Sequence, residues 1–340
     1  MEPIYLTCPP VGPGRVALVY QAIEAWARSP VLSTLVSAFG AEVPYKADVP
    51  ALIAWLLDFS DCWDFRRLQR EATAKDIGEG ARWLLDSSHL TPHQQQLTLK
   101  SAGTLGLIGI GEPMRESFDY VLILGGARLS CLLRPRLASE LIEKHRIQPK
   151  AVVLLAAARP VAESEREATI TYAPDAVTEF DLMNAGAERA FRLAADLAEE
   201  RFDDPENPNR SWVIRRYQAS EGSFPIVSLS APSSEPDRRR ANSADTYEFF
   251  FSRFSVPAYS SLLLVTSEIY VPYQQLEAIR TLALPHDVTV ETVGFPSAWG
   301  GKLQGLAELA NYLQEIRSTL QSAHRFIATY PRESDHEVTA

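Results

Sequence analysis

The hydrophobic positions follow two different rhythms along the chain. From about residue 15 to residue 108 they recur with helical spacing, as in RVALVYQAIEAWARS at 15–29, VPALIAWLLDFS at 49–60 and EGARWLLDSS at 79–88. Apolar residues that return every three or four positions form one stripe of an α-helix. We therefore predict a helical lobe over residues 1–117.

After residue 118 the pattern changes to short apolar runs that alternate with amphipathic segments. The runs lie at 120–126, 150–158, 224–231, 261–267 and 287–294, and the predicted helices at 135–146, 176–200, 241–254, 271–283 and 302–327. Runs so short and so continuously apolar are typical of parallel strands buried on both faces. The alternation predicts an α/β domain with a three-layer, doubly wound, mostly parallel sheet, which is a Rossmann-like fold.

The predicted α/β domain covers residues 118–330 and includes the last long helix. Residues 331–340 are expected to form a disordered tail. The segment 201–222 interrupts the alternation, and its SWVIRRYQA stretch at 211–219 is either an extra strand or one arm of a hairpin.

Composition narrows the classes of function. The chain of 340 residues has a net charge of -10, which argues against nonspecific binding of nucleic acid. No apolar run approaches the ~20 residues that span a bilayer, so we expect no membrane partner. Three widely spaced cysteines, Cys8, Cys62 and Cys131, favour a reduced, cytoplasmic setting with free thiols. A homo-oligomer is possible.

The segment DYVLILGGARLSCLLRPR at 119–136 holds the first candidate site. Gly125 and Gly126 follow the first predicted strand directly, where a missing Cβ allows a sharp turn and a close approach to a ligand. Three arginines come next, at Arg128, Arg134 and Arg136, and Pro135 suits the first position of a helix. A helix start with nearby arginines is suited to binding an anion, although a tight turn with solvated arginines gives the same pattern.

Other strand ends supply similar chemistry. In open parallel sheets, ligands bind beyond the carboxyl ends of the strands. Arg159 follows the second strand, and the third apolar run is followed by Arg238 to Arg240, then by Asn242 as a plausible N-cap and by Thr246. The fourth ends in Thr266 and Ser267, with Glu268 and Tyr270 after them. We expect these loops to line one edge of the sheet.

The ordered set of these segments resembles the YdcF/SanA/ElyC-like family of bacterial domains over about residues 118–295. The resemblance rests on Leu124-Gly125-Gly126, Arg136, Glu179, Asn242 with Thr246, and Val265-Thr266-Ser267. The chain departs from the family pattern at Tyr270 and Tyr273, which stand where the family has His and Arg. The resemblance implies a nucleotide-like or phosphorylated ligand, and S-adenosylmethionine or a nucleotide as the possible cofactor.

The first hypothesis is an enzyme or binding protein for an anionic small molecule, with phosphoryl or adenosyl transfer or hydrolysis as the reaction. Its acid/base candidates are Glu179, Asp181, Glu268 and Tyr270; its ligand-binding candidates are Gly125, Gly126, Arg128, Arg134, Arg136, Arg159, Arg240, Asn242, Thr246, Thr266 and Ser267. Cys131 is either a nucleophile in the glycine–arginine loop or a buried thiol.

Two alternatives stay open. One is a catalytically silent binding or assembly protein of the same fold. The other is a magnesium-dependent diphosphate enzyme that uses Asp58, Asp61 and Asp64, whose regular spacing is also that of acids paired with Arg66 and Arg67. We expect no zinc site, because Pro92 interrupts the helix that His89 and His93 would need.

Overall fold

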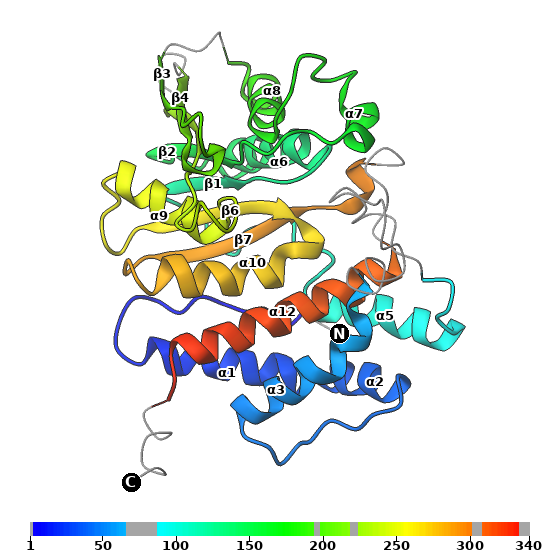
Figure 1. Cartoon of the computed structure of the whole chain (residues 1–340). Helices are drawn as coiled ribbons and strands as arrows, with labels where there is room; N and C mark the ends of the chain where they lie inside the picture. Colours follow the sequence, from blue (N-terminus) through cyan, green and yellow to red (C-terminus); the bar gives the residue numbers. More distant parts are fainter. Residues whose placement is uncertain (1–2, 66–86, 194–197, 218–223, 301–307, 333–340) are drawn as a thin grey trace. The chain divides into compact units, whose positions relative to one another are not determined.

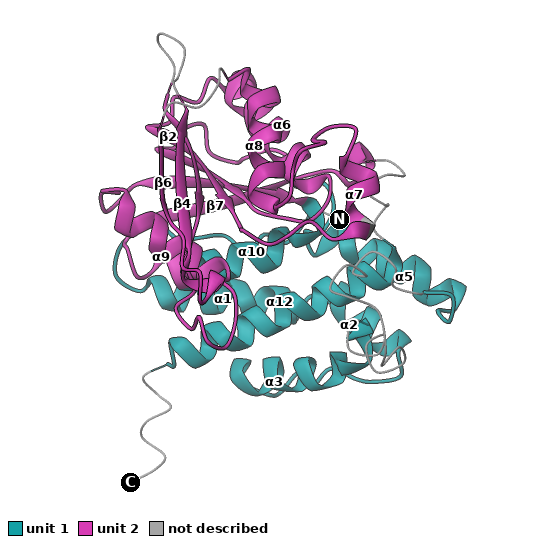
Figure 2. Ribbon diagram, turned by 45° about the horizontal axis from the view of Figure 1, so that its top comes forward, with its two compact units in different colours: residues 1–110, 268–280, 307–340 teal, residues 111–267, 281–306 magenta. Residues whose placement is uncertain are grey.

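The computed structural model describes residues 3–65, 87–193, 198–217, 224–300 and 308–332 (Figure 1). The chain divides into two compact units that are interleaved in sequence (Figure 2). One unit comprises residues 1–110, 268–280 and 307–340, and the other comprises residues 111–267 and 281–306.

A seven-stranded, mostly parallel sheet forms the second unit, which confirms the predicted α/β class. Its strands are β1 (Tyr120–Leu124), β2 (Ala151–Ala156), β3 (Ala198–Phe202), β4 (Trp212–Tyr217), β5 (Ile226–Ser230), β6 (Ser261–Ser267) and β7 (Thr289–Phe295). They lie in the order β3-β4-β5-β2-β1-β6-β7. β5, β2, β1, β6 and β7 pair in parallel, and β3 and β4 extend one edge as antiparallel strands.

Helices lie on both faces of this sheet. The unit's α-helices are α6 (Ser130–His145), α7 (Glu163–Thr169), α8 (Glu179–Phe191) and α9 (Ser243–Arg253). Buried residues of α6 and α8, such as Leu141 and Met183, share one core with Val121 and Val152. On the other face, Phe250 of α9 meets Tyr120 of β1 edge to face, with ring centroids 6.0 Å apart. Because both faces are covered, the central strands can be apolar throughout.

The start of α6 differs from the prediction. Pro135 was expected to begin the helix, but α6 begins at Ser130 and Pro135 lies inside it. Proline lacks an N–H group, so it cannot donate to the carbonyl of Cys131 four residues earlier. That carbonyl lies against Gly186 of α8, where an added Cβ would come within 2.4 Å of it. The absent N–H and the absent Cβ together allow the two helices to approach closely.

Helices make up the other unit. They are α1 (Arg15–Ala27), α2 (Pro30–Ala38), α3 (Val49–Phe59), α5 (Pro92–Thr104), α10 (Val271–Ala278) and α12 (Leu309–Thr329), with short 3-10 turns at Ser60–Trp63 and Glu268–Tyr270. Several have strong N-caps; Thr91, for example, forms a capping box with Gln94. Arg317 of α12 donates to the carbonyl of Leu57 at 2.6 Å and ties α12 to α3.

Three differences from the expected elements stand out. The chain at 198–202 forms β3, whereas a helix was predicted through residue 200. SWVIRRYQA supplies β4, so the hairpin alternative is the one observed. The last helix groups with the N-terminal helices, whereas the sequence placed it with the sheet.

Three predictions lie outside the described residues: the helix at 79–88, the beginning of the helix at 302–327 and the tail beyond residue 332. None of the described helices has the length and apolar content needed to cross a bilayer.

Candidate functional site

Arg134 fills the space where the ends of β1 and β6 meet. Its side chain is buried, and Nη1 donates to the carbonyl of Leu124 at 2.8 Å and also to the carbonyl of Gly125. Nη2 donates to Oγ of Ser267 at 3.1 Å. The guanidinium therefore bonds to the protein itself, and it links two neighbouring strand ends.

The two glycines are explained by packing. A Cβ on Gly125 would lie 2.8 Å from the carbonyl oxygen of Leu155, and a Cβ on Gly126 would lie 2.8 Å from Nη1 of Arg134. Neither glycine has the left-handed backbone that only glycine adopts readily. The Gly-Gly pair is therefore required by the close approach of β2 and by the Arg134 guanidinium packed over it.

A buried charge triad lies just beyond the carboxyl end of β2. Nη2 of Arg159 donates to both carboxylate oxygens of Glu165 at 2.9 Å and to Oε1 of Glu179 at 2.8 Å. All three side chains are almost fully buried, with exposed fractions of 11%, 1% and 10%. Two carboxylates thus share one guanidinium at the edge of the sheet.

The triad changes how easily Glu179 gives up its proton. Burial raises the pKa of Glu179, and the hydrogen bond and positive charge of Arg159 only partly oppose this. Although burial alone would lower it, the bonds to Glu179 and Glu165 raise the pKa of Arg159, so this arginine stays charged. A carboxyl group with a raised pKa beside a fixed cation is suited to proton transfer.

Two more arginines interact with this triad. Arg128, in the β1–α6 loop, interacts electrostatically with Glu165 and Glu167 of α7, and Arg240 interacts in the same way with Glu179. Arg128 has a left-handed backbone with a φ of 53° and is outside any helix cap. Such backbone strain in a bulky residue is most common at functional sites.

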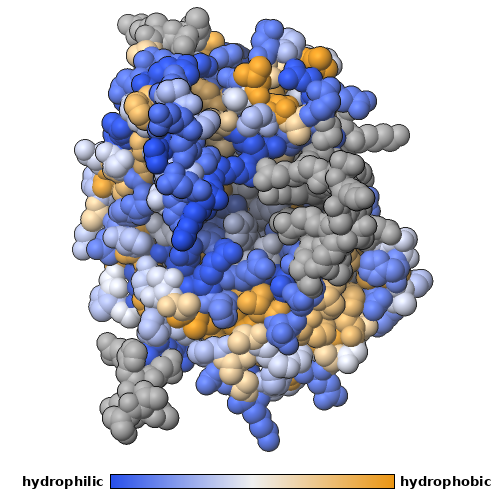
Figure 3. Space-filling model, viewed as in Figure 1, coloured by the Kyte–Doolittle hydropathy of each residue, from blue (hydrophilic) through white to orange (hydrophobic). Residues whose placement is uncertain are grey.

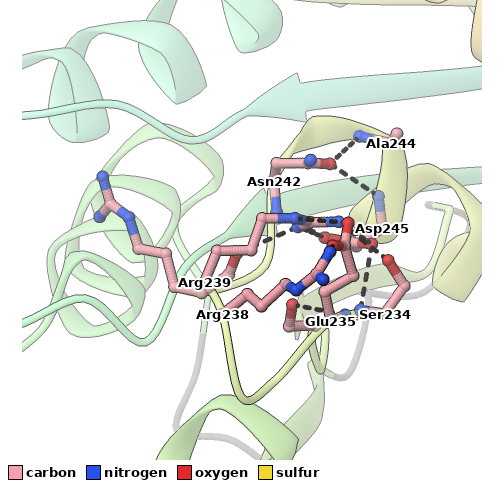
Figure 4. Close-up of polar contacts among 9 residues, drawn as sticks. Ser234, Glu235, Arg238, Arg239, Asn242, Ala244 and Asp245 are labelled. Atoms are coloured by element: carbon pink, nitrogen blue, oxygen red, sulfur yellow. Dashed lines mark hydrogen bonds and ion pairs between the residues drawn. The ribbon is translucent and has the colours of Figure 1, made fainter.

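The turn between β5 and α9 is built from its own ion pairs (Figure 4). Arg239 pairs with Glu235 at 3.3 Å and with the Asp245 carboxylate. Asn242 caps α9 by accepting from the N–H groups of Ala244 and Asp245. Burial would raise the pKa of Asp245, but bonds from Arg239, Ser234 and Asn242 lower it to about 2. Arg239 therefore serves to fix the turn.

Several other predicted residues have structural partners. Arg136 is more than half exposed, pairs with Glu140 at 2.8 Å and lies over the Trp299 ring. The Asp181 carboxylate completes the capping box of α8 by accepting from Thr178 N at 2.9 Å. Thr246 donates to the carbonyl of Asn242 at 2.9 Å within α9. These contacts use the side chains to stabilise helices.

The remaining candidates lie at the end of β6 and in the helical unit. Thr266 is fully buried, and its Oγ1 has no hydrogen-bond partner among the described residues. Glu268 belongs to the helical unit, where it accepts from the N–H of Gly109 at 3.2 Å. Tyr270 is half-buried in the 3-10 turn of the same unit. The structure therefore divides the predicted residues between two units.

Cys131 and the aspartates of the helical lobe have protein partners as well. Cys131 is fully buried, burial raises its pKa to about 12, and its thiol donates to the carbonyl of Gly126 at 2.7 Å. Asp61 and Asp64 pair with Arg317 at 2.7 Å and 3.5 Å. The expected partners Arg66 and Arg67 lie outside the described residues, within which no group of acids, histidines and cysteines is arranged to hold a metal.

The sequence reasoning missed Glu165. It lies at the third position of α7, and its carboxylate accepts from the N–H of Ala162 at 3.0 Å as well as from Arg159. The only sequence signal was an acid in the first turn of a short helix, which is common. Glu165 pairs with Arg159 because the chain folds back between the end of β2 and α7, and the sequence does not show this turn.

The surface near the site is polar. Figure 3 shows mainly hydrophilic residues over the β3–β4 hairpin and the β5–α9 turn. Cross-strand ion pairs cover this hairpin, with Glu199 bonded to Arg215 at 2.8 Å and Glu200 to Arg216 at 3.1 Å. Charged side chains on an edge strand discourage unwanted pairing with other strands.

Comparison with known proteins corrects the family assignment. Residues 12–106 match the family described as the Rv3785 N-terminal domain. Over 335 residues the chain is 38% identical to "Uncharacterized protein Rv3785" of Mycobacterium tuberculosis H37Rv and to "Uncharacterized protein Mb3814" of Mycobacterium bovis. The alignments cover 93% of this chain and 91% of each relative. No solved structure matches.

The resemblance to the YdcF/SanA/ElyC-like family is therefore wrong. It rested on short motifs such as Leu-Gly-Gly and Val-Thr-Ser, and the structure explains the glycines of the first by the packing of Arg134 and Leu155. Glycine is common wherever the backbone turns tightly or approaches another segment closely, so a Gly-Gly pair does not identify one family. The match at residues 12–106 and the relatives that align along nearly the whole chain show instead that this protein belongs to the Rv3785 family.

Proposed function

We propose that this protein binds a phosphorylated small molecule at the carboxyl edge of its parallel strands and acts on it as a transferase or hydrolase. The proposal is carried by one observation, the buried Glu179–Arg159–Glu165 triad at the end of β2. Burying three charges is costly, so such groups are concentrated where proton transfer or ligand binding requires them. In this proposal Glu179 transfers the proton, Arg159 positions Glu179, and Arg128 and Arg240 bind the ligand.

Strand order and the position of Arg134 together favour this place for the site. The parallel strands lie in the order β5-β2-β1-β6-β7, so the chain reverses its direction of travel across the sheet at β1. We propose that the unit is a doubly wound, Rossmann-like domain, in which ligands bind near that reversal. Arg134 fills the gap between β1 and β6, which favours the neighbouring β1–β2–β5 edge, with Arg128, Arg159 and Glu179, as the ligand site. A cytoplasmic setting remains our expectation.

The experiment is a binding screen followed by turnover. Isothermal calorimetry with adenine nucleotides and sugar phosphates should detect at least one ligand, and Arg128→Ala or Arg240→Ala should weaken it by about tenfold or more. Arg136→Ala is the matched control, because its partner is Glu140 and it lies outside the triad. S-adenosylmethionine is no longer favoured, because that expectation depended on the corrected resemblance.

Glu179→Gln separates catalysis from binding. This variant keeps a side chain of similar shape beside Arg159 but cannot transfer a proton, so the ligand should still bind while turnover is lost. Binding without turnover in the unmodified protein would favour the catalytically silent alternative. If no phosphorylated compound binds at all, the proposal fails.

A further inference from the structure

The chain between β2 and α8 leaves the sheet and returns to the same point. The N–H of Val161 donates to the carbonyl of Val177 at 2.9 Å, and Pro160 and Thr178 form an isolated antiparallel bridge. Residues 161–177, which include α7, therefore form a loop whose two ends are hydrogen-bonded to each other. We call this stretch the α7 segment.

Small side chains hold the α7 segment in place. Its buried apolar residues are Val161, Ala168, Ala173 and Ala176, whereas its larger apolar residues Ile170, Tyr172 and Val177 are exposed by 47%, 39% and 61%. A segment that buries little apolar surface is released at low cost in free energy. It is attached in the site through the Glu165–Arg159 contact, and nearer its end through Tyr172, whose carbonyl accepts from Arg189 of α8.

The Glu165 carboxylate lies on Nη2 of Arg159, and both of its oxygens accept from this nitrogen at 2.9 Å. Its bond from the N–H of Ala162, at 3.0 Å, lies within the α7 segment and belongs to the capping box of α7. The Arg159 side chain is 11% exposed, and the same nitrogen also donates to Glu179 at 2.8 Å. A second anion that used this same nitrogen would have to replace Glu165.

Formal charges indicate which anion fits. With the α7 segment in place, the three guanidiniums of Arg128, Arg159 and Arg240 interact electrostatically with the three carboxylates of Glu165, Glu167 and Glu179, so the net charge of these six groups is zero. Without Glu165 and Glu167, one carboxylate remains and the net charge is +2. This matches a phosphate dianion better than a single carboxylate.

We infer that Glu165 occupies a phosphate subsite on Arg159, and that the phosphate group of the ligand displaces it and releases the α7 segment. The inference rests on the proposed function and deepens it by naming the group that binds and the group that leaves. The α7 segment thereby acts as an internal competitor. While Glu165 lies on Arg159, the phosphate subsite is blocked. The apparent dissociation constant of the ligand is therefore the intrinsic constant divided by the fraction of molecules in which Glu165 has left.

The test compares Glu165→Gln with Glu163→Gln. Both substitutions remove one negative charge from α7, but Glu163 is 93% exposed and contacts only Arg166 among the described residues, whereas Glu165 lies on Arg159. Inorganic phosphate, titrated by calorimetry at constant ionic strength, should bind Glu165→Gln about tenfold more tightly than the unmodified protein. Glu163→Gln should behave as the unmodified protein does.

Amide hydrogen exchange gives a second readout, which is independent of the measured affinity. Phosphate added to the unmodified protein should accelerate exchange at residues 163–173, and Glu165→Gln should show that acceleration without phosphate. Equal phosphate affinity in the two proteins, unchanged exchange, or no phosphate binding in either would overturn the inference. The proposed function would still stand if larger phosphorylated compounds bind in the screen above, so the two failures can be told apart.

Discussion

Arg134 and Ser267 join the carboxyl ends of β1 and β6 through a bond of 3.1 Å between Nη2 and Oγ. The same guanidinium satisfies the carbonyls of Leu124 and Gly125, so one buried cation serves three acceptors from two strands. The bonds of Nη1 and Nη2 therefore go to the protein itself. They fix the two strand ends beside which the triad of Arg159, Glu165 and Glu179 lies.

Replacing this cation should destabilise the fold strongly. We expect Arg134→Met to lower the free energy of unfolding by about 3 kcal/mol, because buried acceptors lose a charged donor. Chemical denaturation followed by circular dichroism measures this. Arg136→Ala, two positions away on the exposed side of α6, should cost less than about 1 kcal/mol. Similar losses in the two variants would contradict the structural role of Arg134.

The contact between α6 and α8 should be intolerant of a single methyl group. Gly186→Ala would place a Cβ within 2.4 Å of the Cys131 carbonyl and 2.9 Å of Leu132 Cα, both of them backbone atoms. We expect the free energy of unfolding to fall by about 2 kcal/mol. Gly103→Ala in α5 is the control, since no atom lies within 4 Å of its added Cβ. That change should be neutral or stabilising by up to about 1 kcal/mol.

The β5–α9 turn should make stability depend on acid pH. The pKa of Asp245 is lowered to about 2 in the folded protein, whereas an aspartate in an unfolded chain titrates near 4. The ionised form therefore stabilises the fold by about 2 kcal/mol above about pH 4, and this contribution disappears as the pH falls towards 2.

Asp245→Asn tests this dependence. The unfolding free energies of the unmodified and variant proteins should differ most at pH 6 and converge near pH 2. Asp237→Asn is the control, because Asp237 is 76% exposed and pairs only with surface groups. A constant difference between Asp245→Asn and the unmodified protein across this range would show that the carboxylate charge contributes nothing.

The thiols of Cys62 and Cys131 should differ sharply in reactivity. Cys131 is buried with a pKa of about 12, so at pH 8 only about one molecule in ten thousand carries its thiolate. Cys62 is exposed and, although burial of its thiol raises its pKa too, it should react first with iodoacetamide. Peptide mapping by mass spectrometry after brief labelling identifies the site. Early modification of Cys131 would contradict its burial.

Much of the architecture was predictable because the strands are short, apolar and bounded by turn residues. The five predicted runs correspond to β1, β2, β5, β6 and β7, and β6 matches at both ends. The stretch at 198–202 was misjudged, because AEERF carries no β pattern of its own. All five of its residues are exposed, and β3 forms because its charged side chains pair with those of β4.

The local elements could be predicted from the spacing of neighbouring residues, on which buried parallel strands, amphipathic helices and their caps depend. The spacing did not show which charged groups pair, because that is set by the folded arrangement of the chain. Four arginines follow strands and have similar surroundings in the sequence. In the structure Arg134 donates to backbone carbonyls and Arg136 pairs with Glu140. Arg159 pairs with two buried carboxylates, and Arg128 interacts electrostatically with the glutamates of α7. The physical reason is that ion pairing depends on distances across a folded chain and on burial, and neither is encoded in the spacing of residues along it.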